Sequence, residues 1–258
     1  MTEITAWFAR YGRHDLPWRR TRDRWAVLVS EVMLHQTQVP RVAAAWPEFY
    51  GRFPTPDAMA QAGPGVVIQA WGTLGYPRRA RRLWEAAAVI AAQGWPDDLT
   101  SLPGVGRYTA RAVAAQCDDT DVPAVEVNGR RVAERAAGRA LSDRDAERIL
   151  VELGVPLRGR DRLLALMDVG AVVCRPREPR CDECPLRGQC ATRGARAGER
   201  GSRQPRYEGS FRQRRGRVMA RLRAGEGVDV GSLDAGALRS LVADGLAVVD
   251  ADAVARLP

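Results

Sequence analysis

The sequence predicts an all-helical protein of one or two domains. Apolar residues recur at intervals of three and four along most of the 258-residue chain, and no strand-rich segment precedes Leu246. No apolar run reaches the roughly 18 residues that a membrane-spanning helix needs, and the first residues lack the features of a signal peptide. We therefore expect a cytoplasmic helical protein that is long enough to bury a substantial core.

Helical spacing of apolar residues defines the expected elements in order. Thr2 is in position to cap the first helix and Gly12 to end it, and Ser142 begins a later helix as a capping-box-like Ser-x-x-Asp that Gly154 and Pro156 stop. The expected helices cover approximately residues 4–11, 25–34, 42–50, 58–71, 79–93, 107–113, 142–153 and 163–173.

The composition favours a polyanionic partner. There are 40 basic and 31 acidic residues, for a formal net charge of +9, and every counted basic residue is arginine, since the chain has no lysine. The guanidinium fork suits phosphate because it binds bidentately. Composition alone leaves two explanations open, nucleic-acid binding and a generally arginine-rich proteome.

The segment Leu102–Gly106 forms the most informative turn. Gly104 and Gly106 flank the small apolar Val105 directly before a helix-compatible run that starts at Arg107. Glycines allow the backbone to approach a ligand closely, and the free N–H groups of a helix start favour a phosphate. A simple corner between two helices explains these five residues equally well.

Several polar residues lie in unusual places. Glu31 falls inside an apolar helix, where it either points to solvent or is partly buried with a raised pKa. Glu126 and Asn128 stand at an expected helix start, with arginines behind them.

Four cysteines fall close together in a Cys-x6-Cys-x2-Cys-x5-Cys pattern: Cys174, Cys181, Cys184 and Cys190. In a cytosolic chain such a cluster indicates metal ligation rather than disulfides. Zinc and an iron–sulfur cluster are both possible ligands. Zinc sites usually pair two Cys-x2-Cys knuckles. This chain has a single knuckle, and the spacing therefore favours an iron–sulfur cluster over zinc.

The chain beyond the cysteines divides into a linker and a small terminal unit. Residues 191–216 are rich in Arg, Gly and Ser and are expected to form a mobile basic linker. Residues 217–258 predict two short helices and a strand. This unit is interpreted either as winged-helix-like or as an appendage that packs on the rest of the protein.

Taken together, the motifs resemble those of the helix–hairpin–helix DNA glycosylases. Within that superfamily the chain is most similar to the MutY-type adenine glycosylases, in a short actinobacterial form. The similarity covers about residues 3–191 and rests on the four cysteines and on four segments: Leu16–Arg19, Ser30–Val39, Leu74–Tyr76 and Leu102–Ala110.

The resemblance implies a bilobal helical fold with a [4Fe–4S] cluster held by Cys174, Cys181, Cys184 and Cys190. Residues 1–20 and 130–190 would form the cluster domain, and residues 21–129 a six-helix barrel domain with the hairpin. The partner would be duplex DNA that contains a mispair or lesion, with the target base flipped out. We expect a monomer.

The resemblance also assigns roles to individual residues. Glu31 matches the acid that protonates the leaving adenine, Glu126 occupies the place of an aspartate that stabilises the cationic sugar, and Tyr108 and Asn128 match pocket positions. The expected DNA contacts come from the turns around this pocket and from the hairpin: Gln36, Thr37, His35, Tyr76, Leu74, Gly104, Val105 and Gly106.

Three departures from the family pattern bear on function. Glu126 replaces aspartate and Gly129 replaces a branched residue, so the carboxylate gains one methylene of reach, and a displacement of about 1 Å costs on the order of 100-fold in rate. His35 replaces glutamine. Too few residues follow Cys190 to form the C-terminal domain that recognises 8-oxoguanine in full-length members.

The expected function is therefore a monofunctional glycosylase that removes adenine mispaired with 8-oxoguanine or guanine. Two alternatives stay open because of Glu126 and Gly129: a paralogue that excises another base, such as mispaired thymine or uracil, and an iron–sulfur protein that senses lesions and cuts poorly. Strand-cleaving glycosylases form a Schiff base through an amine, and a chain without lysine has no internal amine to supply it. We expect no lysine-based lyase activity.

Overall fold

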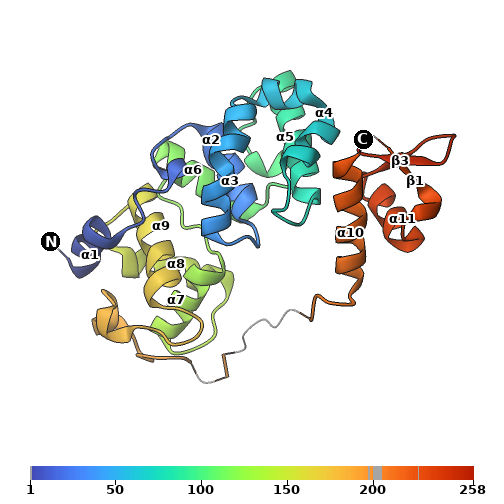
Figure 1. The fold of residues 1–258 in the computed structure, drawn as a ribbon. Coiled ribbons are helices and arrows are strands. Elements are labelled where there is room, and N and C mark those ends of the chain that lie inside the picture. Colours follow the sequence, from blue (N-terminus) through green and yellow to red (C-terminus); the bar gives the residue numbers. More distant parts are fainter. Residues whose placement is uncertain (1, 197, 200–204, 226) are drawn as a thin grey trace. The chain divides into compact units, whose positions relative to one another are not determined.

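The computed structural model describes residues 2–196, 198–199, 205–225 and 227–258. The described part is mainly helical (Figure 1), which confirms the all-α prediction. The helices are α1 (Glu3–Tyr11), α2 (Arg24–Leu34), α3 (Val39–Arg52), α4 (Pro56–Ala70), α5 (Arg78–Gln93), α6 (Arg107–Asp118), α7 (Val127–Ala137), α8 (Asp143–Gly154), α9 (Gly159–Asp168), α10 (Phe211–Ala224) and α11 (Ala235–Ala243). Within these ranges, no helix has the length and apolarity to cross a membrane.

Contacts divide the chain into two units. The first unit comprises Met1–Glu31 and Val105–Ser202, and the second comprises Val32–Gly104 and Arg203–Pro258. These boundaries differ from the expected lobes, because α6 belongs with the cysteine region rather than with residues 21–104. The reason is packing: α6 contacts α9, and Ala112 and Ala115 share an apolar cluster with Leu163.

The first unit has its core between α1 and helices α7 to α9. Ile4 and Phe8 of α1 are buried against Val132 of α7, Leu150 of α8 and Leu164 of α9. A π-helical turn, Val169–Val173, continues α9 towards the first cysteine of the cluster, and short 3-10 turns at Cys181–Glu183 and Arg187–Gln189 carry the chain past the others.

Helix starts in this unit differ in whether a side chain caps them. Ser142 caps α8 as expected, since its hydroxyl oxygen accepts the N–H of Asp145 at 3.1 Å. Thr2 precedes α1, but its side chain makes no capping hydrogen bond and lies instead 2.9 Å from the hydroxyl of Thr5.

The second unit is built on α3, α4 and α5, and the C-terminal segment packs onto it. Phe49 of α3 meets Trp71 at the end of α4 edge to face, with 5.4 Å between ring centroids, and α4 lies along α5. Arg81 of α5 donates to the carbonyl of Asp244 at 2.9 Å. A Cβ at Gly245 would overlap the Arg81 guanidinium, and its φ of +63° is one that glycine adopts without strain.

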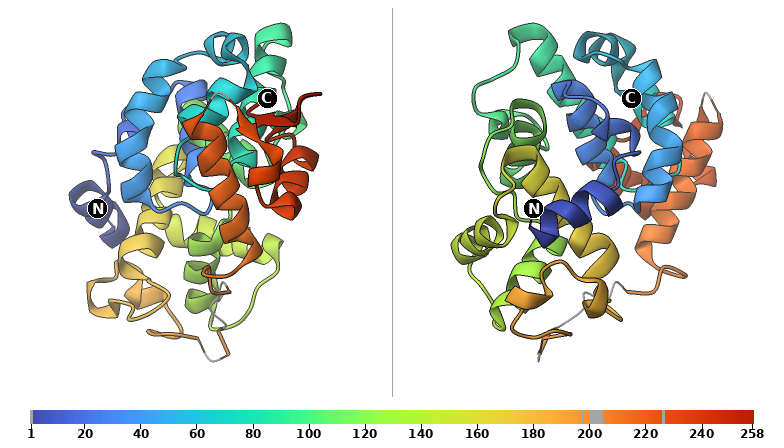
Figure 2. Two further views of the ribbon diagram at one scale, coloured as in Figure 1. Left: turned by 45° about the vertical axis from the view of Figure 1, so that its right-hand side comes forward. Right: turned by 90° about the vertical axis from the view of Figure 1, so that its left-hand side faces the viewer.

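The C-terminal segment contains α10, α11 and a small antiparallel sheet (Figures 1 and 2). Its strands, β1 (Val228–Asp229), β2 (Val248–Val249) and β3 (Val254–Arg256), lie in the order β1-β3-β2, with Val228 opposite Ala255 and Val248 opposite Arg256. Helix α10 begins at Phe211, inside the range expected to be linker, because Ser210 caps it and Val218 and Leu222 bury its inner face. The winged-helix interpretation stays a prediction.

Candidate active site

Glu31 is a buried carboxylate, so the solvent-exposed alternative is wrong. Its residue is 3% exposed, near the end of α2. The amide of Gln116 on α6 donates to Oε1 of Glu31 at 2.8 Å. Burial raises the pKa of Glu31 above its ordinary value, and hydrogen bonds from Gln116 and Tyr108 only partly oppose this rise. The side chain thus holds a proton more readily than an exposed glutamate does.

Tyr108 stands at the start of α6, between this acid and an apolar cluster. Its hydroxyl lies 3.8 Å from the sulfur of Met167, and its ring packs with Met167 against Ala112 and Ala115. Burial, followed by the negative charge of Glu31, raises its pKa well above the ordinary value. Tyr108 therefore stays a neutral phenol that donates a hydrogen bond to Glu31.

Glu126 is fixed by the helix that follows it. Oε2 accepts the backbone N–H of Asn128 at 2.7 Å and its side-chain amide at 2.9 Å, and Oε1 accepts the N–H of Gly129 at 2.7 Å. Glu126 is thus the N-cap of α7, where an anion is favoured by free N–H groups and the helix dipole. Burial raises its pKa and these hydrogen bonds lower it, with a net rise.

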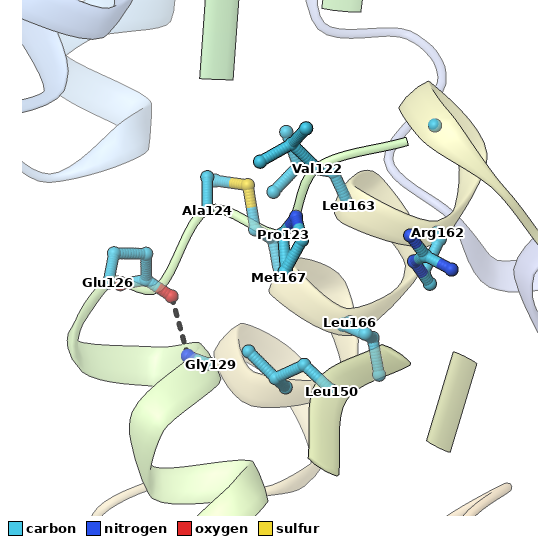
Figure 3. A pocket seen from close by; sticks show the side chains of 11 residues that line it. Val122, Pro123, Ala124, Glu126, Gly129, Leu150, Arg162, Leu163, Leu166 and Met167 are labelled. Atoms are coloured by element: carbon cyan, nitrogen blue, oxygen red, sulfur yellow. Dashed lines mark hydrogen bonds between the residues drawn. The ribbon is translucent and has the colours of Figure 1, made fainter. Parts of the chain in front are cut away.

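A pocket of about 350 Å³ opens beside Glu126 and Gly129. Figure 3 shows the Glu126 carboxylate bonded to Gly129, with Leu150 and Met167 on the wall. A Cβ at position 129 would lie 3.4 Å from Cδ1 of Leu150 and 3.8 Å from Oε1 of Glu126. A side chain at position 129 would therefore contact both the pocket wall and the longer carboxylate.

Asn128 also connects this carboxylate to the cysteine region. Its side-chain oxygen accepts Nη2 of Arg131 at 2.8 Å, and Nε of Arg131 donates to the carbonyl of Cys174 at 2.7 Å. A Cβ at Gly170 would come within 2.8 Å of Cβ of Asn128, so the π-helical turn packs directly against α7. The position of Asn128 is therefore set by two elements at once.

Sequence reasoning missed a second buried carboxylate in the first unit. Asp168 is fully buried at the end of α9, where Arg19 binds it bidentately at 2.7 and 2.9 Å and Arg13 donates Nε at 2.5 Å. Burial would raise the pKa of Asp168, but the hydrogen bonds and charge of Arg19 outweigh this effect and lower it. The available signal was the one noticed at Glu31, a carboxylate inside an apolar helix.

In the second unit, Arg79 holds together two turns that contain predicted DNA contacts. It donates to the carbonyls of Val32 and Met33 at 2.9 Å, to the hydroxyl of Thr37 at 2.9 Å and to the carbonyl of Gly75 at 3.0 Å. Burial lowers its pKa to about 10. No sequence pattern indicated this role, because arginine is the commonest charged residue of the chain.

The two turns share an unusual backbone. Gln36 and Tyr76 both have positive φ, 57° and 48°, and both side chains are solvent-exposed, whereas Thr37 and Leu74 are buried. Next to them, His35 is half-buried, and burial together with the charge of Arg79 lowers its pKa. Gln36 and Tyr76 are thus accessible to a partner molecule, and the buried Thr37 and Leu74 support the turns that carry them.

The hairpin turn has the glycine that its backbone requires. Gly104 has φ of +78°, and a Cβ there would lie 2.7 Å from Cβ of Arg82 on α5. Val105 is buried. Gly106 is exposed at the N-cap of α6, and because glycine has no side chain, the helix start has no side-chain cap. The first N–H groups of α6 are therefore left for a ligand or for water.

The four predicted cluster ligands line a single cavity of about 300 Å³, together with Arg135 and Val173. Nη1 of Arg135 lies 3.5 Å from the sulfur of Cys174. Burial raises the pKa of Cys184 to about 11, so this thiol is protonated at neutral pH. Binding of iron to its sulfur would displace that proton. Across the described residues, no three His, Cys, Asp or Glu side chains converge tightly enough to hold one metal ion. The fit to a cluster rests on the shared cavity and the all-thiol donor set.

Comparison with known proteins assigns the family. Residues 29–155 match the HhH-GPD superfamily of base excision DNA repair proteins. The adenine DNA glycosylase of Mycobacterium tuberculosis is 44% identical over the whole chain and 93% of that protein, and that of Mycolicibacterium smegmatis is 44% identical over 86% of the chain and 79% of that protein. The chain belongs to the MutY-type adenine DNA glycosylases. A thermostable thymine-DNA glycosylase structure is also similar, with 27% identity and a TM-score of 0.66 over 74% of the chain and 93% of that structure.

This glycosylase thus has the helix–hairpin–helix fold that the sequence predicted, and it is a base-excision DNA repair enzyme. Its first unit contains Glu31, Tyr108, Glu126 and Asn128, and its second unit contains the turns with Gln36 and Tyr76. Glycosylases of this fold generally bind a [4Fe–4S] cluster, and the cysteine cavity of this glycosylase offers the donor set for one.

Proposed function

We propose that this glycosylase hydrolyses the N-glycosidic bond of adenine mispaired with 8-oxoguanine or guanine in duplex DNA. The observation that carries the proposal is the environment of Glu31, a buried carboxylate whose raised pKa suits it to hold a proton. The names of the mycobacterial relatives, with 44% identity, favour adenine as the base.

In the proposed reaction Glu31 delivers its proton to the leaving base. The electron pair of the glycosidic bond then passes to the base, and positive charge develops on the sugar. The Glu126 carboxylate, held by the N–H groups of Asn128 and Gly129, stabilises that charge without having to reorganise. Water adds to the sugar and gives its proton to solvent, from which Glu31 takes up a proton again. Burial favours the protonated form of Glu31, and the hydrogen bond from Tyr108 holds its carboxyl group in place.

The proposed DNA contacts come from the turns and from the hairpin. Tyr76 and Gln36, exposed at positive φ, enter the base stack and the gap opposite the flipped base, and His35, Thr37 and Leu74 support them. In the hairpin, the backbone N–H groups after Gly104, Val105 and Gly106 bind a phosphate at the start of α6.

A [4Fe–4S] cluster fits the cysteine cavity, with Cys174, Cys181, Cys184 and Cys190 as ligands. When bound, the cluster would join the four cysteine sulfurs and so cross-link this loop. The chain's own residues prepare the site, since Arg131 and Arg135 donate to the carbonyls of Cys174 and Arg175 at 2.7 and 2.8 Å. We further propose a cytoplasmic monomer that leaves the DNA strand intact, because the chain has no lysine for lyase chemistry.

A second candidate is excision of another base, such as mispaired thymine or uracil. Two observations favour it: the open pocket beside Glu126 and Gly129, and the similarity to a thymine-DNA glycosylase structure. The identity to that structure is 27%, against 44% to the adenine glycosylases, so adenine remains the first choice.

The test is single-turnover base release from duplexes that contain adenine opposite 8-oxoguanine, adenine opposite guanine, thymine opposite guanine or uracil opposite guanine. Wild type should release adenine fastest. Glu31→Gln should lower that rate by about 10²–10⁴-fold and keep DNA affinity, because an amide cannot donate the proton. Glu152→Gln, which removes a charge from an exposed position on α8, is the matched control and should behave as wild type. Faster release of thymine or uracil would favour the second candidate, and an unchanged rate in Glu31→Gln would remove Glu31 from the mechanism.

A further inference from the structure

Helix α10 carries positive charge that its own residues do not balance. Six of its 14 residues are arginine and none is acidic. Elsewhere in the protein exposed helices mix the two signs: on α8, Arg148 lies 2.8 Å from Glu152 and 3.8 Å from Asp145. Like charges three or four residues apart repel each other and weaken a helix. The composition of α10 is therefore unfavourable in the free protein.

The arginines of α10 divide between an inner and an outer face. Val218 and Leu222 are buried, and on the same side Arg215 pairs with Asp244 of the same unit at 2.6 Å. On the outside, three exposed arginines repeat at intervals of three and four residues: Arg214, Arg217 and Arg221. This spacing places them in one stripe, which we call the α10 stripe, about 10 Å long at 1.5 Å per residue.

Two of the three arginines of the α10 stripe have no acidic partner among the described residues. The third, Arg214, forms an ion pair with Asp234 at 3.8 Å. Arg221 donates to the carbonyl and the hydroxyl of Ser232, which carry no charge. Arg217 has no hydrogen-bond or ion-pair partner among the described residues. The other acid near this helix that forms an ion pair with it, Asp244, binds Arg215 on the inner face.

We propose that the α10 stripe binds the phosphate backbone of duplex DNA. A duplex carries one negative charge per about 1.7 Å of axis, and the guanidinium fork binds phosphate bidentately. An acidic protein partner fits less well, because protein interfaces rely on several apolar anchors. The outer face of this helix exposes one, Phe211 at its first turn, and the later neighbours Ala220 and Ala224 are small. The stripe lies outside residues 3–191, on which the family resemblance rests, and it depends on the proposed function only in that DNA is the substrate.

The test compares two triple variants with the same change in charge. One is Arg214→Gln/Arg217→Gln/Arg221→Gln. The other replaces three exposed arginines of the same segment outside α10: Arg206, Arg239 and Arg256. Each lowers the formal net charge from +9 by three, to +6. Affinity for an undamaged duplex is measured over a series of salt concentrations.

The α10 triple should make the slope of log affinity against log salt less negative by about 2–3, at about 0.9 per phosphate contact. A fourfold rise in salt would then cost wild type up to about 40-fold more affinity than it costs the variant. The control triple should keep the wild-type slope. Equal slopes in wild type and the α10 triple would overturn the proposal, because they would show that the stripe does not contact DNA. Equal changes of slope in both triples would also overturn it, because they would show an effect of net charge alone.

Two further measurements separate folding and catalysis from this surface. Thermal unfolding checks the fold, and glutamine preserves helix propensity. If the triple does not fold, Arg217→Gln alone, which breaks no recorded hydrogen bond, should reduce the slope by about 0.9, and an unchanged slope would reject the stripe. Single-turnover excision at saturating enzyme should keep its rate in the α10 triple. A wild type that releases no base would defeat the proposed function and leave the slope comparison valid.

Discussion

Replacing Glu126 by aspartate separates the structural and chemical roles of this carboxylate. Glu126 caps α7 through the N–H groups of Asn128 and Gly129, both at 2.7 Å. Aspartate is an equally good N-cap, so Glu126→Asp should leave the free energy of unfolding within about 0.5 kcal/mol of wild type. Glu126→Ala should lose about 1 kcal/mol, or about 2–4 °C in melting temperature for a chain of this length.

The activity should change although the stability does not. Aspartate withdraws the carboxylate by about one carbon–carbon bond, and a displacement of about 1 Å is worth on the order of 100-fold in rate. If the extra methylene of Glu126 merely displaces the charge from an adenine site, Glu126→Asp raises adenine release by up to about 100-fold. We expect this outcome in single-turnover assays with adenine opposite 8-oxoguanine. Glu126→Gln, which keeps the side-chain length of glutamate but removes its charge, is the control and should release adenine more slowly than wild type.

Two results would refute this reasoning. Slower base release by Glu126→Asp on the best substrate would show that catalysis needs the longer glutamate side chain. This is the result expected for a pocket adapted to another base. Unchanged release of every base would show that the carboxylate does not face the sugar. Combining Glu126→Asp with Gly129→Val tests the neighbouring space, where a Cβ would lie 3.4 Å from Leu150.

The remaining predictions address the acid, the hairpin, the cluster and the product. Burial raises the folded-state pKa of Glu31, so its contribution to stability is present below the unfolded value and is lost as pH rises through the folded value; Glu31→Gln should therefore unfold at a higher temperature than wild type at pH 7 but not at pH 4, and a lower temperature at both would contradict this. Gly104→Val should weaken binding to any duplex, because its Cβ meets Arg82 at 2.7 Å and its φ is positive; unchanged affinity in a gel-shift titration would exclude the hairpin role. Anaerobically purified protein should contain about four irons per chain, and Cys184→Ser should lose iron and the absorption in the violet, whereas stoichiometric zinc in place of iron would reject the cluster. Borohydride should trap no covalent complex with substrate DNA, and a trapped N-terminal adduct would contradict the monofunctional assignment.

Local patterns determined the helical fold and most of the motifs. Helix boundaries follow from periodicity and from caps such as Ser142, because these depend on residues only a few positions apart. The Gly104 turn was readable for the same reason, since a positive φ selects glycine locally. Glu31 was recognisable as a carboxylate in an apolar helix, but whether it faced solvent was open.

Tertiary structure decided everything that depends on residues distant in the chain. Gln116 lies opposite Glu31 only because α6 packs against α2, and Arg19 lies opposite Asp168 only because the 3-10 turn Pro17–Arg19 packs against the end of α9. The same holds for Arg79, whose bonds to Thr37 and two neighbouring carbonyls give no signal in a chain full of arginines. Burial, and with it the direction of each pKa shift, is a property of the packed neighbours, and a sequence pattern can indicate a buried acid without identifying what surrounds it.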